Sequence, residues 1–460
     1  MSEDRLMVSV SGVRGMIGGT LTPRVACDFG CAFAKLLGAG KTVVLGRDTR
    51  PSGPMVRNAV TSGLLSGGVN VVDLGVVTTP GVALMTRLLA ADGGVIITAS
   101  HNPPAYNGIK FLQPSGTGLT AATAAHLKQI WSDGPYDLVG VDELGEATVN
   151  RDTHDEHVSA VCNVTDVATI ADQRFRVVVD SINGAGCAVT PMLMDSLGVD
   201  LVHLNGLPDG RFAHEPEPIQ PNLTSLCQAV RDNQAHVGFA QDPDADRLVV
   251  VDEQGNFIGE EYTLALAAAF VLRSRKGKLA TNLATSRMID DLAAAAGVEV
   301  VRAPTGEANV VEAMQREGCI FGGEGNGGVI DPRVVPVRDS LAGMAMILQY
   351  LAETGKPLSE LAAAIPAYVM LKTKLPCPAA AAATVAARAR EMFANEGGAR
   401  FNTDDGLRVD LPGGWVSVRA SNTEQIMRIM AEAQDRDAAE ALVRRVRKIA
   451  DEVIGKDARA

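Results

Sequence analysis

Apolar runs and amphipathic segments alternate along most of this chain, and the same succession occurs three times. Each copy begins with a β-rich run and continues into a segment of helical periodicity; these runs are 42–45, 177–179 and 279–283. Each copy closes where a glycine ends the helix and an apolar run restarts, in GVNVVDL (68–74), GVDLVHL (198–204) and GVEVVRA (297–303). Because the copies are unequally spaced, the pattern predicts duplicated α/β domains with right-handed βαβ crossovers in parallel or mixed sheets.

The C-terminal part of the chain has a different pattern. Residues 415–419 and 426–431 are predicted as two strands that bracket the polar phrase RASNTEQ. A helix is predicted from about Asp437 to Ile454, and its apolar positions repeat at helical spacing, so it should cover a sheet. The last domain is therefore expected to be a smaller α+β unit.

Polar or proline-rich stretches near 144–156, 252–261 and 364–380 are the predicted linkers. They divide the chain into four domains: 1–150, 151–256, 257–368 and 369–460. A chain of 460 residues is too long for one ordinary core, which agrees with this division.

Composition narrows the class of protein. Hydrophobic residues make up 46% and charged residues 21%, the profile of a globular protein. The net charge of −12 argues against nucleic acid or an anionic membrane as the main partner. No apolar run approaches the roughly 18–20 residues that span a bilayer, so we expect a cytoplasmic protein. The seven cysteines are scattered without zinc spacing.

The loop TASHNPPAYNGIKF follows an apolar run at 95–97 and carries the first candidate chemistry. Ser100 would stand at the end of a buried strand, where an exposed and rigid hydroxyl suits a nucleophile of phosphoryl transfer. His101 can donate hydrogen bonds to phosphate oxygens, and Lys110 offers a charge or a proton. Taken alone, the loop could equally be a proline-marked polar turn without chemistry.

The phrase QDPDADR places Asp242, Asp244 and Asp246 at alternate positions directly after a predicted strand. Three carboxylates in such a loop can converge on one hard cation, and Mg²⁺ is favoured over a solvated acidic turn because the like charges would otherwise repel. The twelve-residue calcium pattern that ends in glutamate is absent from the sequence.

Two further loops could bind a ligand. FGGEGNGGVI sets Glu324 and Asn326 among glycines, which allows close approach to a hydroxylated ligand, although a flexible hairpin turn is as good an explanation. RASNTEQ offers a phosphate cradle of a guanidinium, two hydroxyls and an amide: Arg419, Ser421, Asn422 and Thr423. Arg14 and Arg47 are additional basic candidates, and Arg14, among glycines, is the better one.

Together and in this order, the loops resemble those of the α-D-phosphohexomutase superfamily, which includes phosphoglucosamine mutase, phosphomannomutase and phosphoglucomutase. TASHNP (98–103) resembles its phosphoserine loop, DPDADR (242–247) its metal loop, GEGNGG (323–328) its sugar loop and RASNTE (419–424) its phosphate loop. The resemblance covers the whole chain. It implies four domains around a central cleft, three similar α/β domains with mixed sheets and a smaller C-terminal α+β domain.

The resemblance also implies an activity. Ser100 would be phosphorylated, and one Mg²⁺ per chain would bind Asp242, Asp244, Asp246 and an oxygen of that phosphate. The enzyme would interconvert hexose 1-phosphate and hexose 6-phosphate through a hexose 1,6-bisphosphate. Arg14, Lys110 and Arg247 would line the reacting phosphoryl group, and either Lys110, with a lowered pKa, or His101 would move the proton. Glu324 and Asn326 would hold the sugar, and the cradle at 419–423 its fixed phosphate.

The sugar loop departs from one common family pattern, G-E-x-S-G-H, because Asn326 replaces its serine and Gly328 its histidine. The departure resembles a variant loop of archaeal-type members and leaves the sugar open: glucosamine phosphate is favoured, then mannose or glucose phosphate. A serine-dependent metal phosphatase and a non-catalytic sugar-phosphate sensor are the alternatives of another class. A monomer or homodimer is expected, with a small hexose phosphate as its partner.

Overall fold

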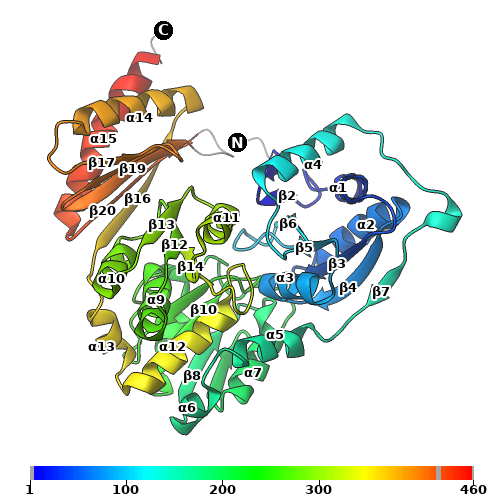
Figure 1. Ribbon diagram of the computed structural model, residues 1–460, viewed down its shortest axis with the longest axis horizontal. Helices are drawn as coiled ribbons and strands as arrows, with labels where there is room; N and C mark the ends of the chain where they lie inside the picture. Colours follow the sequence, from blue (N-terminus) through cyan, green and yellow to red (C-terminus); the bar gives the residue numbers. More distant parts are fainter. Residues whose placement is uncertain (1–4, 421–425, 458–460) are drawn as a thin grey trace.

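The computed structural model describes residues 5–420 and 426–457, which form four sheets with helices packed against them (Figure 1). The first unit contains a seven-stranded sheet: β1 (Met7–Ser9), β2 (Gly12–Met16), β3 (Thr42–Arg47), β4 (Asn70–Val76), β5 (Gly93–Ile97), β6 (Tyr106–Leu112) and β7 (Ala147–Val149). Its helices are α1 (Pro23–Leu37), α2 (Gly53–Ser66), α3 (Thr79–Leu88), α4 (Ala121–Asp133) and the short η1 (Val141–Glu143).

The second and third units each contain a four-stranded sheet. The second has β8 (Arg176–Asp180), β9 (Asp200–Leu204), β10 (Val237–Gln241) and β11 (Leu248–Val251), with α5 (Thr153–Cys162), α6 (Val167–Asp172), α7 (Gly186–Ser196), η2 (Gln220–Asn222) and α8 (Thr224–Asp232). The third has β12 (Leu279–Asn282), β13 (Val300–Ala303), β14 (Phe321–Glu324) and β15 (Gly328–Ile330), with α9 (Glu261–Ser274), α10 (Met288–Ala296), α11 (Glu307–Glu317), α12 (Ser340–Thr354) and α13 (Leu358–Ala363).

The three sheets share one strand order, which confirms the predicted repeat. The common order is β6-β5-β3-β4 in the first unit, β11-β10-β8-β9 in the second and β15-β14-β12-β13 in the third. In each unit the last three of these strands are parallel and the first is antiparallel to its neighbour. The sheets are therefore mixed, as the sequence pattern predicts.

The shared order places three of the candidate loops at one topological position. TASHNP lies between β5 and β6 and DPDADR between β10 and β11, and GEGNGG spans the end of β14, the turn and the start of β15. Each loop thus joins the one antiparallel pair of its four-strand set, at the carboxyl end of a central strand. Ligands of α/β proteins bind at such carboxyl ends.

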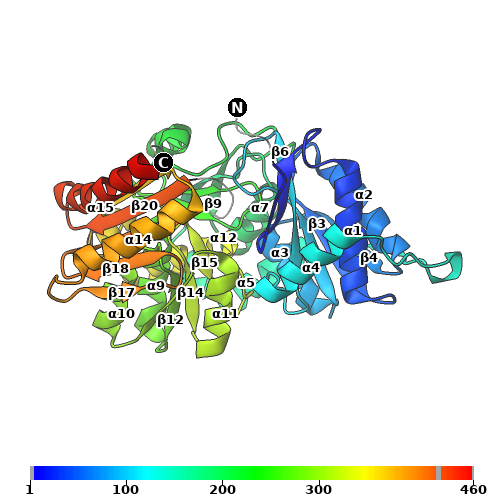
Figure 2. The ribbon, with the colours of Figure 1, turned by 90° about the horizontal axis from the view of Figure 1, so that it is seen from above.

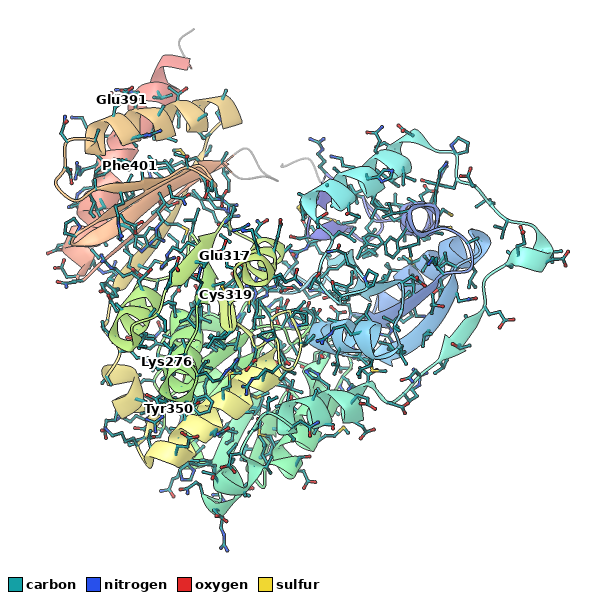
Figure 3. All side chains as sticks on the ribbon, viewed as in Figure 1. Lys276, Glu317, Cys319, Tyr350, Glu391 and Phe401 are labelled. Atoms are coloured by element: carbon teal, nitrogen blue, oxygen red, sulfur yellow. The ribbon has the colours of Figure 1, made fainter. Side chains whose placement is uncertain are left out.

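The predicted strands form because their side chains are buried on both faces. In β3, Val43 and Leu45 pack against α1 and α2, whereas Val44 faces the core on the other side of the sheet. That second core is continuous through the first three units and surrounds α9 and α12, helices that are apolar on nearly every face. Tyr350 of α12, labelled in Figure 3, packs on Phe270 of α9 with ring centroids 6.1 Å apart.

The fourth unit is smaller and its sheet is antiparallel throughout, in the order β16-β20-β19-β18-β17. Its elements are β16 (Val369–Pro376), β17 (Arg400–Asn402), β18 (Leu407–Leu411), β19 (Gly414–Ala420), β20 (Ile426–Ala433), α14 (Ala379–Phe393) and α15 (Arg436–Asp457). Met427, Ile429 and Ala431 alternate along β20 and are buried against the two helices. The predicted C-terminal α+β unit is confirmed.

The four units lie in a row that bends, with the first and fourth at its two ends (Figures 1 and 2). Arg408 of β18 fixes the fourth unit to the third: its guanidinium lies 4.1 Å from the ring centroid of Trp415 and donates a hydrogen bond to the Leu283 carbonyl. None of the helices within residues 5–420 and 426–457 is both long enough and apolar enough to cross a bilayer.

Two of the predicted linkers contain strands. The stretch 144–156 includes β7, which pairs with β4 at the edge of the first sheet, and 364–380 includes β16 of the fourth sheet. The three residues of β7 are all exposed, so no alternation of apolar and polar residues marks them as a strand.

Candidate active site

Ser100 sits in a strained turn at the end of the fully buried strand β5. Its φ of 48° lies in the left-handed region, which a residue with a Cβ adopts only when its surroundings hold it there. The hydroxyl donates a hydrogen bond to Oδ2 of Asp242 across 2.7 Å, and the Nδ1 atom of His101 lies 3.3 Å from it. The fold thus brings the predicted nucleophile against the predicted metal loop.

Arg50 holds this turn, and sequence reasoning missed it. Its side chain is fully buried and pairs with Asp48 at 3.1 Å. The guanidinium donates hydrogen bonds to four carbonyls of the serine loop, those of Ser100 (2.6 Å), Asn102 (2.6 Å), Pro103 (2.9 Å) and Tyr106 (2.9 Å). Arg47, the basic candidate from the same phrase GRDTR, instead donates to the carbonyl of Asp48. Arg50 is therefore the arginine of this phrase that supports the site.

We predict that Arg50→Met opens the serine loop. The substitution leaves Asp48 buried without its cation and removes the donors of four carbonyls, a loss of about 3 kcal/mol or more. Amide hydrogen exchange in residues 98–107 should become about 100-fold faster. Arg47→Met is the matched control, because it removes a neighbouring guanidinium that donates to the Asp48 carbonyl instead of to the loop. Equal exchange in the two variants would contradict the supporting role.

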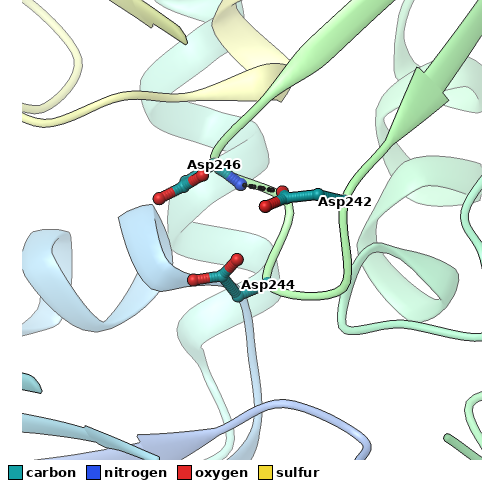
Figure 4. Close-up of side chains that lie close together, drawn as sticks. All are labelled: Asp242, Asp244 and Asp246. Atoms are coloured by element: carbon teal, nitrogen blue, oxygen red, sulfur yellow. Dashed lines mark hydrogen bonds between the residues drawn. The ribbon is translucent and has the colours of Figure 1, made fainter. Parts of the chain in front are cut away.

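Asp242, Asp244 and Asp246 converge in the loop between β10 and β11 (Figure 4). All three are fully buried, and one carboxylate oxygen from each lies within 4.8 Å of the others. The backbone N–H of Asp246 donates to Oδ1 of Asp242 across 3.2 Å, which fixes the turn. Oδ1 of Asp244 and Oδ1 of Asp246 are buried and have no hydrogen-bond partner among the described residues.

The electrostatics of the three carboxylates fit a hard cation. Burial raises the pKa of Asp242 well above its ordinary value, and the charges of Asp244 and Asp246 raise it further. Burial alone would also raise the pKa of Asp244, but the Lys110 ammonium brings it below its ordinary value. Crowded, partly unsatisfied carboxylate oxygens are the ligands that a divalent cation such as Mg²⁺ requires. The residues present therefore fit a metal ion.

The pKa values of Lys110 and His101 are shifted in opposite directions. The Nζ atom of Lys110 lies 2.7 Å from Oδ2 of Asp244 and 3.5 Å from Oδ2 of Asp246. Burial lowers the pKa of Lys110, but these two carboxylates outweigh burial, so the pKa is raised and the expectation of a lowered pKa is wrong for this arrangement. Burial lowers the pKa of His101 to about 2, and nearby Arg247 and Arg14 act in the same direction.

Arg14 and Arg247 bring positive charge to the serine and metal loops. Arg14 lies on β2 opposite Gly108 and donates a hydrogen bond to Oδ1 of Asn102 across 3.0 Å. Nε of Arg247 lies 4.0 Å from Oδ2 of Asp242 and is buried without a hydrogen-bond partner in the described part of the chain. These contacts favour the binding of an anionic group beside Ser100.

The loop between β14 and β15 meets the metal loop directly. The Leu248 N–H donates to the Gly327 carbonyl across 2.9 Å, and a Cβ at Gly327 would lie 2.3 Å from the Leu248 carbonyl oxygen. Glu324 accepts hydrogen bonds at Oε1 from Asn282 (2.7 Å) and from the Gly306 N–H (3.2 Å). Oδ1 of Asn326 is buried, has no partner within residues 5–420 and 426–457, and can accept a hydrogen bond from a ligand hydroxyl.

Arg338 is a second central residue that the sequence did not reveal. It precedes α12, and its guanidinium donates to Oε2 of Glu324 and to Oδ2 of Asp246, both across 2.7 Å. Its Nε lies 2.7 Å from Oε2 of Glu307. Burial lowers the pKa of Arg338, but the three carboxylates raise it well above its ordinary value. Because its partners lie 14, 31 and 92 residues away, no local pattern marks it.

Of the phosphate cradle, Arg419 is described, whereas Ser421, Asn422 and Thr423 lie outside the described residues. Arg419 donates to Oδ2 of Asp405 across 3.0 Å, and its Nε is buried without a hydrogen-bond partner among the residues that the structure describes. Arg428, which sequence reasoning missed, lies opposite Arg419 on β20, and its Nε is likewise unpartnered within that part of the chain. Two guanidiniums on adjacent strands, each with an unpartnered Nε, have the chemistry to bind a dianion.

Models of four protein domains match the chain in order. They are described as phosphoglucomutase/phosphomannomutase alpha/beta/alpha domain I (residues 5–135), domain II (155–255), domain III (259–368) and the C-terminal domain (370–449).

Several named proteins are similar over nearly their whole length. A phosphoglucomutase/phosphomannomutase of Thermococcus kodakarensis is 42% identical over 434 residues, 93% of this chain and 94% of the relative. A probable phosphoglucosamine mutase of Methanopyrus kandleri is 40% identical over 438 residues, 94% of this chain and 95% of the relative. The crystal structure of a phosphoglucomutase/phosphomannomutase family protein of Burkholderia thailandensis superposes with a TM-score of 0.84 at 28% identity, over 97% of this chain and 98% of that one.

Proposed function

Because the chain belongs to the phosphoglucomutase/phosphomannomutase family, it is a phosphohexomutase of the isomerase class, and we propose that it interconverts the 1-phosphate and 6-phosphate of glucosamine. One observation carries the proposal of a phosphoserine mechanism. The Ser100 hydroxyl lies 2.7 Å from a buried carboxylate of the aspartate cluster, in which two oxygens have no partner among the described residues.

In the proposed cycle, phosphorylated Ser100 transfers its phosphoryl group to the free hydroxyl of a hexose monophosphate. The bond from phosphorus to Oγ breaks as the bond to the sugar oxygen forms. The hydroxyl proton passes to His101, whose lowered pKa leaves the imidazole neutral, because Lys110 with its raised pKa already carries a proton. The 1,6-bisphosphate then reorients in the site, so that its other phosphate faces Ser100, and that phosphoryl group is transferred to Oγ of Ser100. This return makes the enzyme a mutase instead of a phosphatase.

The remaining residues hold charge and orient the substrate. Asp242, Asp244 and Asp246 would hold Mg²⁺, which would offset the phosphoryl charge. Arg14 from β2 and Arg247 from the end of the metal loop would contact the same group. The substrate's fixed phosphate would bind Arg428 together with the cradle predicted from the sequence, Arg419, Ser421, Asn422 and Thr423. Glu324 and Oδ1 of Asn326 would accept hydrogen bonds from sugar hydroxyls.

Two observations favour glucosamine phosphate as the substrate. Relatives that are 38–40% identical over nearly their whole length are named probable phosphoglucosamine mutases. In addition, the buried Glu324 and the half-buried Glu307 both pair with the single guanidinium of Arg338, which also pairs with Asp246. A site with this excess of negative charge suits a sugar that carries an ammonium group.

The substrate proposal predicts a ranking of three sugars. With Mg²⁺ and catalytic glucose 1,6-bisphosphate, kcat/KM should be about tenfold or more higher for glucosamine 1-phosphate than for mannose or glucose 1-phosphate. Product analysis of each 6-phosphate gives the three values. Equal low rates on all three sugars would contradict the ranking, and release of inorganic phosphate at the turnover rate would identify a phosphatase instead.

A further inference from the structure

A single guanidinium joins the sugar loop to the metal loop. Arg338 donates one hydrogen bond to Oε2 of Glu324 and one to Oδ2 of Asp246, both across 2.7 Å, from two different nitrogen atoms. The side chain is only 11% exposed, so these charge-assisted bonds lie in a desolvated environment, where geometry is strongly specified.

Gly328 provides the space that Arg338 occupies. A Cβ built on Gly328 would lie 2.1 Å from Cδ and 2.7 Å from Cγ of Arg338, far inside van der Waals contact. Gly328 itself has an ordinary strand conformation in β15, so its backbone does not require glycine. The glycine that departs from the common sugar-loop pattern is therefore explained by the arginine that lies across it.

The two carboxylates depend on Arg338 to different degrees. Asp246 lies in a loop fixed by backbone hydrogen bonds, and Lys110 provides a second cation 3.5 Å from its Oδ2. Oε2 of Glu324, in contrast, has Arg338 as its only cation among the described residues, and the remaining bonds of Glu324 there go to Oε1. Loss of Arg338 should therefore move Glu324 more than it moves the metal loop.

We propose that Arg338, admitted by Gly328, is the positioning residue that determines sugar specificity by holding Glu324 at a fixed place relative to the metal loop. The inference rests on the proposed function of Glu324 in binding sugar hydroxyls. Held in this way, Oε2 of Glu324 keeps one acceptor position for a hydroxyl at a defined distance from the reacting phosphate. Sugars that differ in one substituent would then be distinguished by whether they reach that acceptor.

Three variants test the proposal: Arg338→Met, Gly328→Ala and the double variant. Arg338→Met removes the guanidinium, and Gly328→Ala displaces it with one methyl group while retaining it in the chain. The measurements are kcat and KM for glucosamine, mannose and glucose 1-phosphate, and the dissociation constant of Mn²⁺, followed by electron paramagnetic resonance on the enzyme without sugar. Arg333→Met is the control, because Arg333 lies on the same segment and pairs with Asp331 outside the site.

We expect both single variants to raise KM for glucosamine phosphate at least about tenfold and to reduce the ratio of kcat/KM between the best and worst sugar by about tenfold. Mn²⁺ should bind as tightly as to the wild type or more tightly, because a positive charge beside Asp246 has been removed in Arg338→Met and displaced in Gly328→Ala. The double variant should be no worse than Arg338→Met, since the flexible methionine, which no ion pair anchors, can turn away from the added methyl group.

Additive losses in the double variant would overturn the proposal, because Gly328 would then act independently of Arg338, for instance through Asn326. Parallel loss of Mn²⁺ binding and of sugar binding would also overturn it, since that pattern indicates a general structural role. If Arg338→Met does not fold, Gly328→Ala with an unchanged sugar ranking would be sufficient to reject the idea. Absence of mutase activity in the wild type would instead reject the proposed function.

Discussion

Ser100→Ala should reduce turnover of hexose phosphates by about four orders of magnitude or more. The hydroxyl is the proposed acceptor and donor of the phosphoryl group, and alanine cannot form the covalent intermediate through which both half-reactions pass. The fold should survive, because the serine is held in its left-handed conformation by bonds from Arg50 to the backbone and not by its hydroxyl.

Intact-mass measurement gives the direct test. Wild-type enzyme incubated with glucose 1,6-bisphosphate should gain the mass of one phosphoryl group, and Ser100→Ala should gain none. Ser115→Ala is the control, because Ser115 lies in a turn beyond β6 where its hydroxyl contacts Thr117. Turnover of Ser100→Ala within tenfold of the wild type would exclude the phosphoserine mechanism and favour direct transfer between substrates.

Removal of the divalent cation should have the second largest effect, a loss of activity of about a thousandfold or more. Asp242→Asn should resemble metal removal, because it replaces the carboxylate that accepts the Ser100 hydrogen bond with a neutral amide. In the metal-free protein, however, the same substitution should increase the stability of the fold, because it relieves the mutual repulsion of three buried carboxylates.

These opposite effects give a signature in thermal unfolding. Mg²⁺ at 100 times its dissociation constant stabilises a protein by about 2.7 kcal/mol, so it should raise the melting temperature of the wild type but not of Asp242→Asn. In the presence of a chelator, Asp242→Asn should melt at the same temperature as the wild type or at a higher one. Asp232→Asn, on the surface of α8, should leave both the activity and the Mg²⁺ response unchanged. A wild-type melting temperature that does not change with Mg²⁺ would contradict the metal site.

The parts of this structure that could be predicted from the sequence are those marked by a pattern within a few consecutive residues. The runs at 42–45 and 177–179 form β3 and β8 because their side chains are buried on both faces of a sheet, which a short continuous apolar run indicates. The aspartate cluster was also visible, since its three carboxylates come from one loop of five residues. Strand β7 could not be predicted, because its three residues are all exposed and do not alternate between apolar and polar.

The site residues that could not be predicted from the sequence contact partners far away along the chain. Arg50 reaches carbonyls about fifty residues away, and Arg338 reaches Asp246 across 92 residues. Their importance depends on burial and on the partners that the tertiary fold supplies. The raised pKa of Lys110 has the same origin, because the carboxylates responsible belong to the second unit. Arg419 was found through its phrase, whereas Arg428 became visible only when β20 paired with β19.

The common strand order of the first three units has an evolutionary consequence. Each of the three units has the same hairpin connection, and a different loop occupies it. In the proposed function, one loop carries the nucleophile, one the acidic cluster and one the contacts to the sugar. This separation lets one loop diverge while the strands beneath all three stay unchanged. Under the proposed function, substitutions in the third loop alone would change the substrate preference and leave the phosphoryl-transfer residues of the first two loops unchanged.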